Sequence, residues 1–346
     1  MPIIDPHGRE IRYLRLSVTD KCNFRCRYCR SDGKTTRLND SERLTIAETL
    51  RLVKAFVSLG VERVRLTGGE PLLRPRIMDL VNGLGAIDAL EEVSLSTNAY
   101  LLEKKALPLK EAGIRRVNIS LDSLDPDRFN DITQGGDLIQ VLRGIDAALS
   151  VGLNPVKINM VVMGGINDDE IPAMVRFARE RNVLLRFIET MPIGEDGRAI
   201  MGHHVPMKAI CERIQKVFGG DVDFMKDFTC NSLSKKGKTA GDQREGGGPA
   251  RYVHMKGLGI DIGLISAVSR HFCDTCNRVR LTAFGQLVLC LGKDGEVDLR
   301  TPLRSGLSDE ALQACVLDAI AKKPLRHDFD RYQEMAPMHR MSSLGG

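Results

Sequence analysis

Six of the nine cysteines fall into two tight groups, and each group has the composition of a metal centre. The first group has the spacing C-x3-C-x2-C and consists of Cys22, Cys26 and Cys29. The second has the spacing C-x2-C-x13-C and consists of Cys273, Cys276 and Cys290. Three thiolates can hold three irons of a cubane cluster and leave the fourth iron open to another ligand. We therefore expect two iron–sulfur clusters of this kind.

Two arginines follow the second cysteine group directly. Arg278 and Arg280 alternate along a segment that we expect to be extended, so their guanidinium groups share one face. Such a pair suits a phosphate-bearing substrate. His271 leaves a zinc site with three cysteines as an alternative. We prefer a cluster with an open iron, because zinc would leave the arginines unexplained.

Alternating strands and helices must position these residues. The apolar patterns predict strands at 12–18, 61–66, 92–96, 116–121, 156–162 and 184–188. They predict helices at 44–59, 77–87, 103–112, 138–151 and 170–181. Strands that recur roughly every 30 residues with helices between them indicate parallel βαβ units. About six units, where a full barrel has eight, predict an α/β fold with an incomplete (βα)6 TIM-type barrel. An open sheet with helices on both faces is the alternative.

Polar residues lie within or directly after several of the expected strands. They are the run Gly68-Gly69-Glu70-Pro71, Asn98, Ser120, Asp122, Lys157, Asn159, Glu189 and Met191, the last being the one apolar member. Ligand-binding residues of barrels gather at the carboxyl ends of the parallel strands. Paired glycines allow close backbone approach to a ligand, and we expect the Glu70 carboxylate to take an ammonium group.

The composition changes near residue 226. Lysines and the run Gly246-Gly247-Gly248-Pro249 mark an irregular segment, and a strand-rich piece at 251–266 precedes the second cysteine group. We predict a partial barrel at 1–225 and a smaller α+β region at 226–346 that carries the second cluster and a Gly-Gly tail.

The overall composition narrows the class of protein. The chain has 346 residues, 42% hydrophobic and 27% charged, with a net charge of +5. This weak charge does not demand nucleic acid, and no apolar run reaches the roughly 18 residues that span a bilayer. The first ten residues lack the apolar core of a signal peptide. We expect a cytoplasmic protein with reduced cysteines, bound to neither membrane nor nucleic acid.

The first cysteine loop, with Tyr28 before its last cysteine, resembles the signature of the radical S-adenosylmethionine (SAM) superfamily. The pair of cysteine spacings resembles the GTP 3′,8-cyclase family of molybdenum cofactor biosynthesis. This likeness extends over residues 14–20, 65–71, 118–124, 186–189 and 272–278 and the final Gly345-Gly346. Two positions depart from the family pattern: Ser96 stands where Thr is usual, and Ala99 where Gly is commoner.

The resemblance implies a reaction. One electron cleaves SAM at the first [4Fe–4S] cluster, the 5′-deoxyadenosyl radical abstracts the ribose 3′ hydrogen of GTP, and the sugar radical adds to guanine C8. A second [4Fe–4S] cluster orients the base through its open iron. The implied partners are a reductant protein and a downstream cyclic pyranopterin monophosphate synthase, with the chain a monomer or homodimer.

The resemblance also implies roles for individual residues. Those implied to contact SAM are Tyr28, Gly69, Ser120 and Met191. Those implied to line the GTP site are Arg15, Arg65, Ser96, Lys157, Arg278, Val279 and Arg280. The catalytic set is Arg278, Arg280, Gly345 and Gly346.

Two other functions remain as alternatives. One is a radical SAM peptide-modifying enzyme with an auxiliary cluster. The other is a zinc-stabilised RNA-binding protein, which would need exposed aromatic side chains beside its basic residues. With 5% aromatic residues and no tryptophan, the chain supports that last function poorly.

Overall fold

The computed structural model describes residues 2–29, 40–219, 248–331, 333 and 340–345. Six parallel strands form the centre of its sheet and pair in chain order. They are β1 (Tyr13–Ser17), β2 (Arg63–Thr67), β3 (Glu92–Thr97), β4 (Arg116–Ser120), β5 (Val156–Val162) and β6 (Leu184–Glu189). The predicted six-strand alternation is confirmed. The two edge strands of the whole sheet do not pair with each other among the described residues, so the sheet does not close and the barrel is incomplete.

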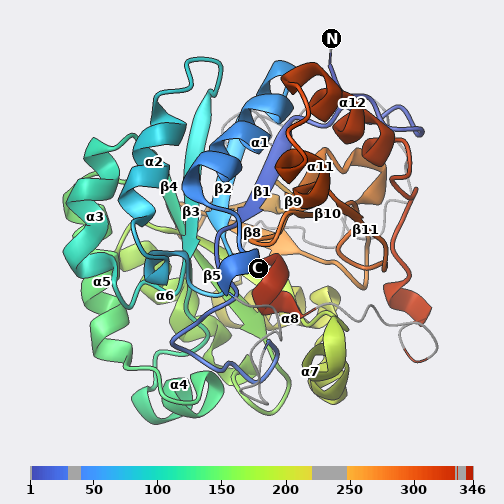
Figure 1. Ribbon diagram of the computed structural model, residues 1–346. Coiled ribbons are helices and arrows are strands. Elements are labelled where there is room, and N and C mark those ends of the chain that lie inside the picture. The colour runs from blue at the N-terminus through green and yellow to red at the C-terminus, as the bar shows by residue number, and fades with distance from the viewer. Residues whose placement is uncertain (1, 30–39, 220–247, 332, 334–339, 346) are drawn as a thin grey trace.

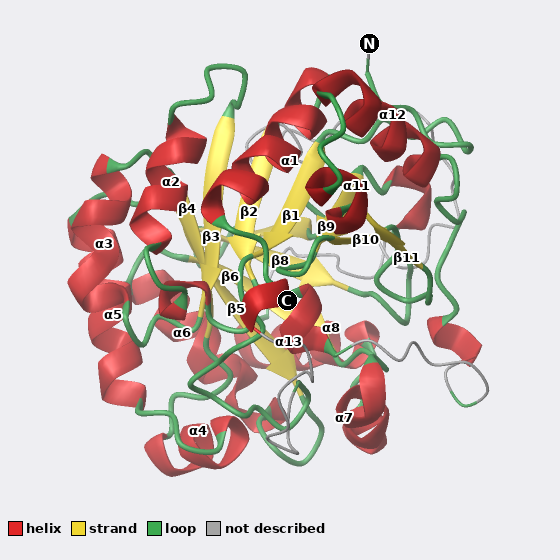
Figure 2. Cartoon of the chain, viewed as in Figure 1, coloured by secondary structure: helices red, strands yellow, loops and turns green. Residues whose placement is uncertain are grey.

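Helices connect these strands and lie around the outside of the sheet (Figures 1 and 2). They are α1 (Ile46–Ser58), α2 (Ile77–Gly85), α3 (Leu102–Glu111), α4 (Pro126–Thr133), α5 (Leu138–Ser150) and α6 (Ile171–Glu180). Helix α1 begins at a capping box, in which Thr45 and Glu48 each accept a hydrogen bond from the other's backbone N–H. The sequence prediction missed α4, although Asp125 as N-cap and Pro126 at the first helical position are ordinary start signals.

Strands of the C-terminal region extend this sheet at both edges. On one side β9 (Arg278–Leu281) pairs in parallel with β1, and β10 (Gln286–Val288) and β11 (Glu296–Asp298) follow antiparallel. On the other side β8 (Ile260–Ile265) pairs in parallel with β6, and β7 (Arg251–Met255) pairs antiparallel with β8. The predicted domain boundary at 225/226 lies outside the described residues and stays a prediction.

Five further helices complete the described chain. After β6 come α7 (Gly194–Ala199) and α8 (Met207–Phe218), and after β11 come α11 (Arg300–Arg304), α12 (Asp309–Ile320) and α13 (Met341–Leu344). Helix α12 packs on α1, with Arg51 donating to Asp309 at 2.8 Å. The C-terminal region therefore packs against the first helix of the chain. No helix in the described ranges is both long and apolar enough to cross a membrane.

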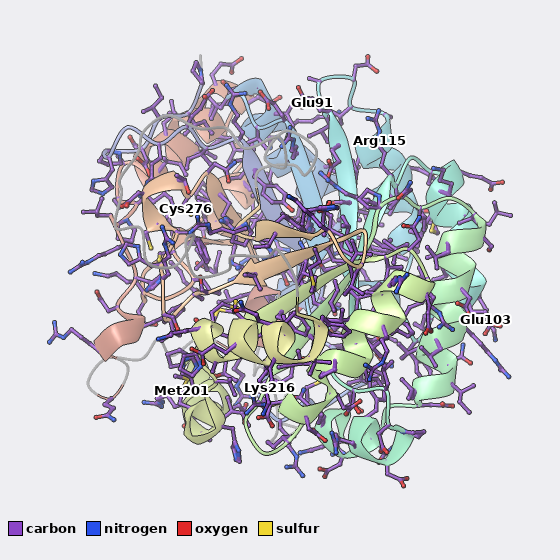
Figure 3. The ribbon with its side chains drawn as sticks, turned by 180° about the vertical axis from the view of Figure 1, so that it is seen from behind. Glu91, Glu103, Arg115, Met201, Lys216 and Cys276 are labelled. Atoms are coloured by element: carbon purple, nitrogen blue, oxygen red, sulfur yellow. The ribbon has the colours of Figure 1, made fainter. Side chains whose placement is uncertain are left out.

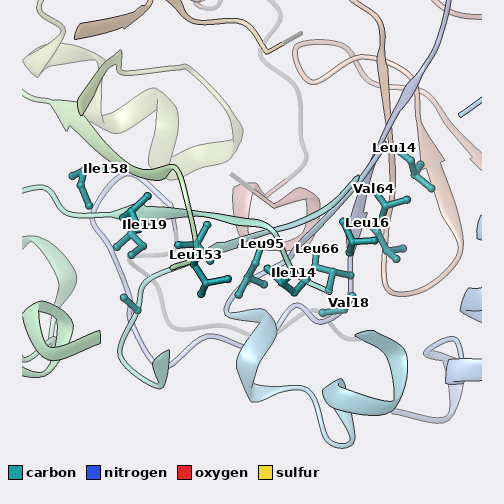
Figure 4. Close-up of a cluster of buried hydrophobic side chains, with 14 of the residues drawn as sticks. Leu14, Leu16, Val18, Val64, Leu66, Leu95, Ile114, Ile119, Leu153 and Ile158 are labelled. Atoms are coloured by element: carbon teal, nitrogen blue, oxygen red, sulfur yellow. The ribbon is translucent and has the colours of Figure 1, made fainter. Parts of the chain in front are cut away.

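Alternation along the strands divides the sheet into an apolar and a polar face. Leu14, Leu16, Val64 and Leu66 are buried in the core cluster shown in Figure 4. Their neighbours in sequence, such as Arg15, point to the other face because successive side chains of a strand alternate. Each buried leucine contributes about 1.5–3 kcal/mol to the fold. The apolar face therefore anchors the helices, and the polar face is left to build a site.

Candidate active site

A pocket on the polar face joins the central strands to the second cysteine group. The empty space in it, open solvent at its mouth included, is about 990 Å³. Strand residues that line it are Arg15, Arg65, Asn118, Asn159, Arg186, Ile188, Ile265, Arg278, Val279, Arg280 and Val288. All three cysteines of the second group also line it. The fold thus places basic residues beside these thiols, as the sequence predicted.

Three arginines stand side by side on neighbouring strands. Arg15 is in register with Arg65 on one side and with Arg280 on the other. Burial lowers the pKa of Arg15 well below its usual range, and the charge of Arg280 lowers it further. Burial, with a smaller contribution from Arg278, lowers the pKa of Arg280 to about 10. Clustered cations of this kind favour an anion such as a phosphate.

Further polar residues continue across the sheet. Ser96, Asn118 and Lys157 are in register on β3, β4 and β5. The Ser96 hydroxyl and Asn118 Oδ1 are buried and make no hydrogen bond to any described residue. The Lys157 ammonium donates to the Tyr252 hydroxyl at 3.3 Å. Because buried polar atoms are normally paired, the two unpaired groups point to a bound ligand.

Arg186 is a pocket residue to which the sequence analysis gave no role. It is buried, and its Nε donates to Asn159 Oδ1 at 2.8 Å. Gly263 on β8 makes room for it, because a Cβ there would lie 2.6 Å from Arg186 Cγ. Arg186 and Asn118 share one signal in the sequence, a polar side chain inside an otherwise apolar strand. The pocket residues Phe272, His327 and Phe329 carry no such signal.

The second cysteine group lies in two loops, next to β8 and β10. Cys273 begins a short 3-10 turn, and Figure 3 labels Cys276 among the C-terminal elements. Burial alone would raise the pKa of Cys276, but Arg278 and Lys323 outweigh it and bring the pKa below its usual value. Burial raises the pKa of Cys273 and Cys290. The charges of Cys276 and Cys290 also raise the pKa of Cys273, and the charge of Cys276 raises that of Cys290, so the three thiols lie close together.

The first cysteine group occupies the loop after β1. The Tyr28 hydroxyl at the end of this loop donates to Asp122 Oδ2 at 2.7 Å, and Cys22 Sγ accepts from the Phe24 N–H at 3.4 Å. Burial, Asp122 and the other two thiols raise the pKa of Cys26. Burial raises the pKa of Asp122 to about 6. This loop is therefore anchored to the end of β4, where Asp122 follows Ser120.

Both cysteine groups have the ligand set of an iron–sulfur cluster. Among the described residues, no three His, Cys, Asp or Glu side chains converge as the ligands of a single ion would. A cubane instead distributes its three thiolates over three separate irons. Anionic thiolates buried beside one another also need a compensating positive centre, which a cluster supplies.

The glycine-rich segment after β2 packs against the first cysteine loop. A Cβ on Gly69 would lie 2.3 Å from the Lys21 carbonyl oxygen, so only glycine fits there. Glu70 is wholly buried, and its carboxylate accepts hydrogen bonds from Leu72 N, Thr97 Oγ1 and Asn98 N. Both carboxylate oxygens thus support the loop, and the expectation that Glu70 also takes an ammonium group stays a prediction.

Ala99 lies in the turn that follows β3. It adopts a left-handed φ of 63°, the region that favours glycine. The turn therefore has the conformation of a glycine turn although the chain has alanine there.

The C-terminal tail reaches the arginines. Arg280 donates to the Gly345 carbonyl, and to the Leu344 carbonyl at 3.3 Å. Gly345 has a φ of 75°, and a Cβ on it would lie 2.2 Å from Thr67 Cγ2. The tail therefore lies between β9 and the segment that follows β2. Gly346 lies outside the described residues.

The pocket does not gather every predicted residue. Of the residues assigned to SAM, Met191 lines it, and Tyr28, Gly69 and Ser120 do not. Of those assigned to GTP, Ser96 and Lys157 do not line it, although Asn118 between them does. The first cysteine group lies outside its lining as well. Val279 lines the pocket although its side chain belongs to the apolar core.

Comparison with known families agrees with this arrangement. The radical SAM superfamily matches residues 16–178, and the family "Molybdenum Cofactor Synthesis C" matches residues 220–329. The crystal structure of Streptococcus suis SuiB bound to S-adenosylmethionine superposes with a TM-score of 0.61. It shares 14% identity, covering 92% of this chain and 68% of SuiB, and so supports the fold alone.

Curated relatives match over the whole chain. The GTP 3′,8-cyclase of Hydrogenovibrio crunogenus is 50% identical over 347 residues, which is 100% of both chains. That of Sinorhizobium medicae is 44% identical over 350 residues, covering 99% of this chain and 94% of the relative. These matches do not favour the peptide-modifying alternative. The chain belongs to the GTP 3′,8-cyclase family of the radical SAM superfamily.

Proposed function

We propose that this chain converts GTP to (8S)-3′,8-cyclo-7,8-dihydroguanosine 5′-triphosphate, the first step of molybdenum cofactor biosynthesis. Family membership supports the reaction. The observation that carries it in this chain is the pocket that brings Arg15, Arg65 and Arg280 together beside the second cysteine group. That pocket combines a phosphate site with an open-iron site.

The cysteines and loops hold the cofactors. When bound, SAM and the first cluster would supply a 5′-deoxyadenosyl radical for removal of the ribose 3′ hydrogen and closure of the bond to guanine C8, and a second electron with a proton would complete the dihydro product. The cluster ligands are the two groups Cys22, Cys26, Cys29 and Cys273, Cys276, Cys290. Residues proposed to contact SAM are Tyr28, Gly69, Ser120 and Met191. Gly69 allows close approach, because its backbone packs directly on the cysteine loop.

The basic residues bind the triphosphate. Arg15, Arg65, Arg278 and Arg280 repel one another in a buried site, and an anion relieves that repulsion. Each charge-assisted bond to phosphate contributes about 1.5–3 kcal/mol. Lys157 extends the same face. These residues fix the substrate so that its ribose and base are held in reactive positions.

Acceptors and the tail orient the rest of the substrate. The unpaired Ser96 hydroxyl and Asn118 Oδ1 are available to base or sugar donors. Gly345 accepts from Arg280 and so holds this guanidinium in place, and Gly346 extends the tail. The protein thereby orients its substrate and limits access of water, while the cofactors carry the radical chemistry.

We further propose a cytoplasmic enzyme, monomer or homodimer, with two protein partners. A reductant protein supplies the electron to the first cluster, and a cyclic pyranopterin monophosphate synthase consumes the product. The cytoplasmic assignment is supported by the eight described cysteines, all of which are free thiols.

The two cysteine groups are tested separately. Replacement of Cys22, Cys26 and Cys29 by serine is expected to leave one cluster and abolish SAM cleavage. Replacement of Cys273, Cys276 and Cys290 is expected to preserve SAM cleavage and stop cyclisation. Cys315→Ser, outside both groups, is the matched control and should retain iron, sulfide and both activities. Stoichiometric zinc in place of iron, or cyclised product from the second variant, would refute the proposal.

A further inference from the structure

Two buried cations contact the second cysteine group from outside the pocket lining. Arg9 lies in the N-terminal arm and is 8% exposed, and Lys323 follows α12 and is 3% exposed. Burying a charge is costly unless it is compensated. Neither residue has a role in the function proposed above, so their burial needs a reason.

Arg9 ties the N-terminal arm to the cysteine loop. Its guanidinium donates to the carbonyl of Cys273 at 2.8 Å, of Leu325 at 2.7 Å and of Pro324 at 2.7 Å. Its Nε also donates to Asp5 at 2.6 Å. One side chain thus holds both the backbone of Cys273, a proposed cluster ligand, and the backbone of Pro324 and Leu325.

Lys323 fixes the other cysteine loop. Its ammonium donates to the carbonyl of Leu289, which directly precedes Cys290. The carbonyl of Lys323 lies 3.1 Å from His7 Nε2, so the same N-terminal arm supports both cations. The two side chains therefore hold both loops that carry the second cysteine group.

Basic residues gather around the second cysteine group. Arg9 forms an ion pair with Asp5 at 2.6 Å, and the Lys323 ammonium donates to a backbone carbonyl. Arg278 and Arg280 line the pocket beside the same three cysteines. Several positive charges therefore lie close to this group.

We propose that Arg9 and Lys323 are positioning residues of the second cluster, which hold its cysteine loops and stabilise its reduced form by their charge. This inference rests on the proposed function, since it requires a cluster on the second cysteine group. One-electron reduction adds a negative charge to the cluster, and nearby cations favour that state. Loss of either cation should therefore move the midpoint potential of the cluster to more negative values.

The test uses the full chain with Cys22, Cys26 and Cys29 replaced by serine, so that only the second cluster contributes. Into this background are placed Lys323→Met, Arg9→Met and the charge-conserving Lys323→Arg. Arg116→Met is the matched control, because Arg116 is a buried cation paired with Glu92 at the start of β4 and contacts neither cysteine loop. The midpoint potential is measured by anaerobic dithionite titration followed by electron paramagnetic resonance, with iron and sulfide analysis.

We expect a more negative potential in both methionine variants. Lys323→Arg and Arg116→Met should keep the potential of the parent. Unchanged potentials in methionine variants that retain full iron overturn the inference and leave the proposed function intact. If the methionine variants do not assemble iron, the charge-conserving variants Lys323→Arg and Arg9→Lys decide. A midpoint potential equal to that of the parent then supports the role of charge, and a shifted midpoint potential overturns it. A parent without iron contradicts the proposed function instead.

Discussion

Replacement of Gly345 by alanine should displace the C-terminal tail from the site and slow cyclisation, with the fold left intact. Gly345 has a φ of 75°, where an L-residue pays about 1–2 kcal/mol. The added Cβ would lie 2.2 Å from Thr67 Cγ2 and 2.8 Å from Gly68 N. The Gly68 backbone belongs to the packed segment after β2 and cannot move aside easily. The tail is therefore the part that moves.

The magnitude follows from the contact that is lost. Arg280 donates to the Gly345 carbonyl, and a hydrogen bond from a charged donor contributes about 1.5–3 kcal/mol. Loss of that amount from the transition state corresponds to a fall in cyclisation rate of about ten- to 150-fold. Thermal stability should change little, because the tail adds few residues to the core.

The assay compares single-turnover cyclisation of GTP with iron content, GTP affinity and melting temperature. Gly202→Ala is the matched control, since no atom lies within 4 Å of the Cβ that it would add. The expected result is a slow Gly345→Ala enzyme with intact clusters and near-normal GTP binding. Cyclisation equal to that of Gly202→Ala would show that the seated tail does not support Arg280, and the reasoning would be wrong.

Three further predictions use the same structure. Lys157→Ala and Arg278→Ala should each weaken GTP binding by about tenfold or more with both clusters intact, because each removes a phosphate contact; unchanged affinity by anaerobic calorimetry in both variants would exclude the assignment. Gly69→Ala should impair SAM cleavage more than GTP binding, because its Cβ would lie 2.3 Å from the Lys21 carbonyl oxygen. Normal SAM cleavage would contradict the proposed close approach of the Gly69 backbone to SAM. Burial raises the pKa of Glu70 from 4.5 to about 7, so its contribution to stability is present below pH 4.5 and is lost as pH rises through about 7. The stability of the parent relative to Glu70→Gln should therefore fall by roughly 3 kcal/mol across this window in urea titrations, and a difference independent of pH would refute the shift.

Much of the fold could be predicted because its signals are local. Helix α5 was expected at 138–151 and spans Leu138–Ser150, and β5 was expected at the positions that it occupies. Apolar periodicity over one element is enough for such assignments. Helix α4 was missed because its eight residues include only two large apolar side chains, Phe129 and Ile132, and only Asp125-Pro126 marks its start.

Parts of the site were also predictable, but not their surroundings. Arg280, Arg15 and Arg65, which the resemblance assigns to the GTP site, are in register on neighbouring strands, and their role stays a prediction. The hydrogen bonds of Glu70 were not predictable, because its donors come partly from β3 and the turn after it. Arg186 was overlooked as a pocket residue, since the room for its side chain depends on Gly263, which is distant in sequence but lies on the neighbouring strand β8.

The amino-acid sequence by itself determined two three-thiolate loops, a sixfold strand–helix alternation and membership of a family, because ligand spacing and periodicity are properties of short segments. Only the tertiary structure decided that β9 and β8 extend opposite edges of one sheet, and that Arg9 contacts Cys273 across 264 residues of sequence. Such pairings depend on strand register and on which buried groups find partners. Those are outcomes of packing the whole chain, and no local pattern specifies them.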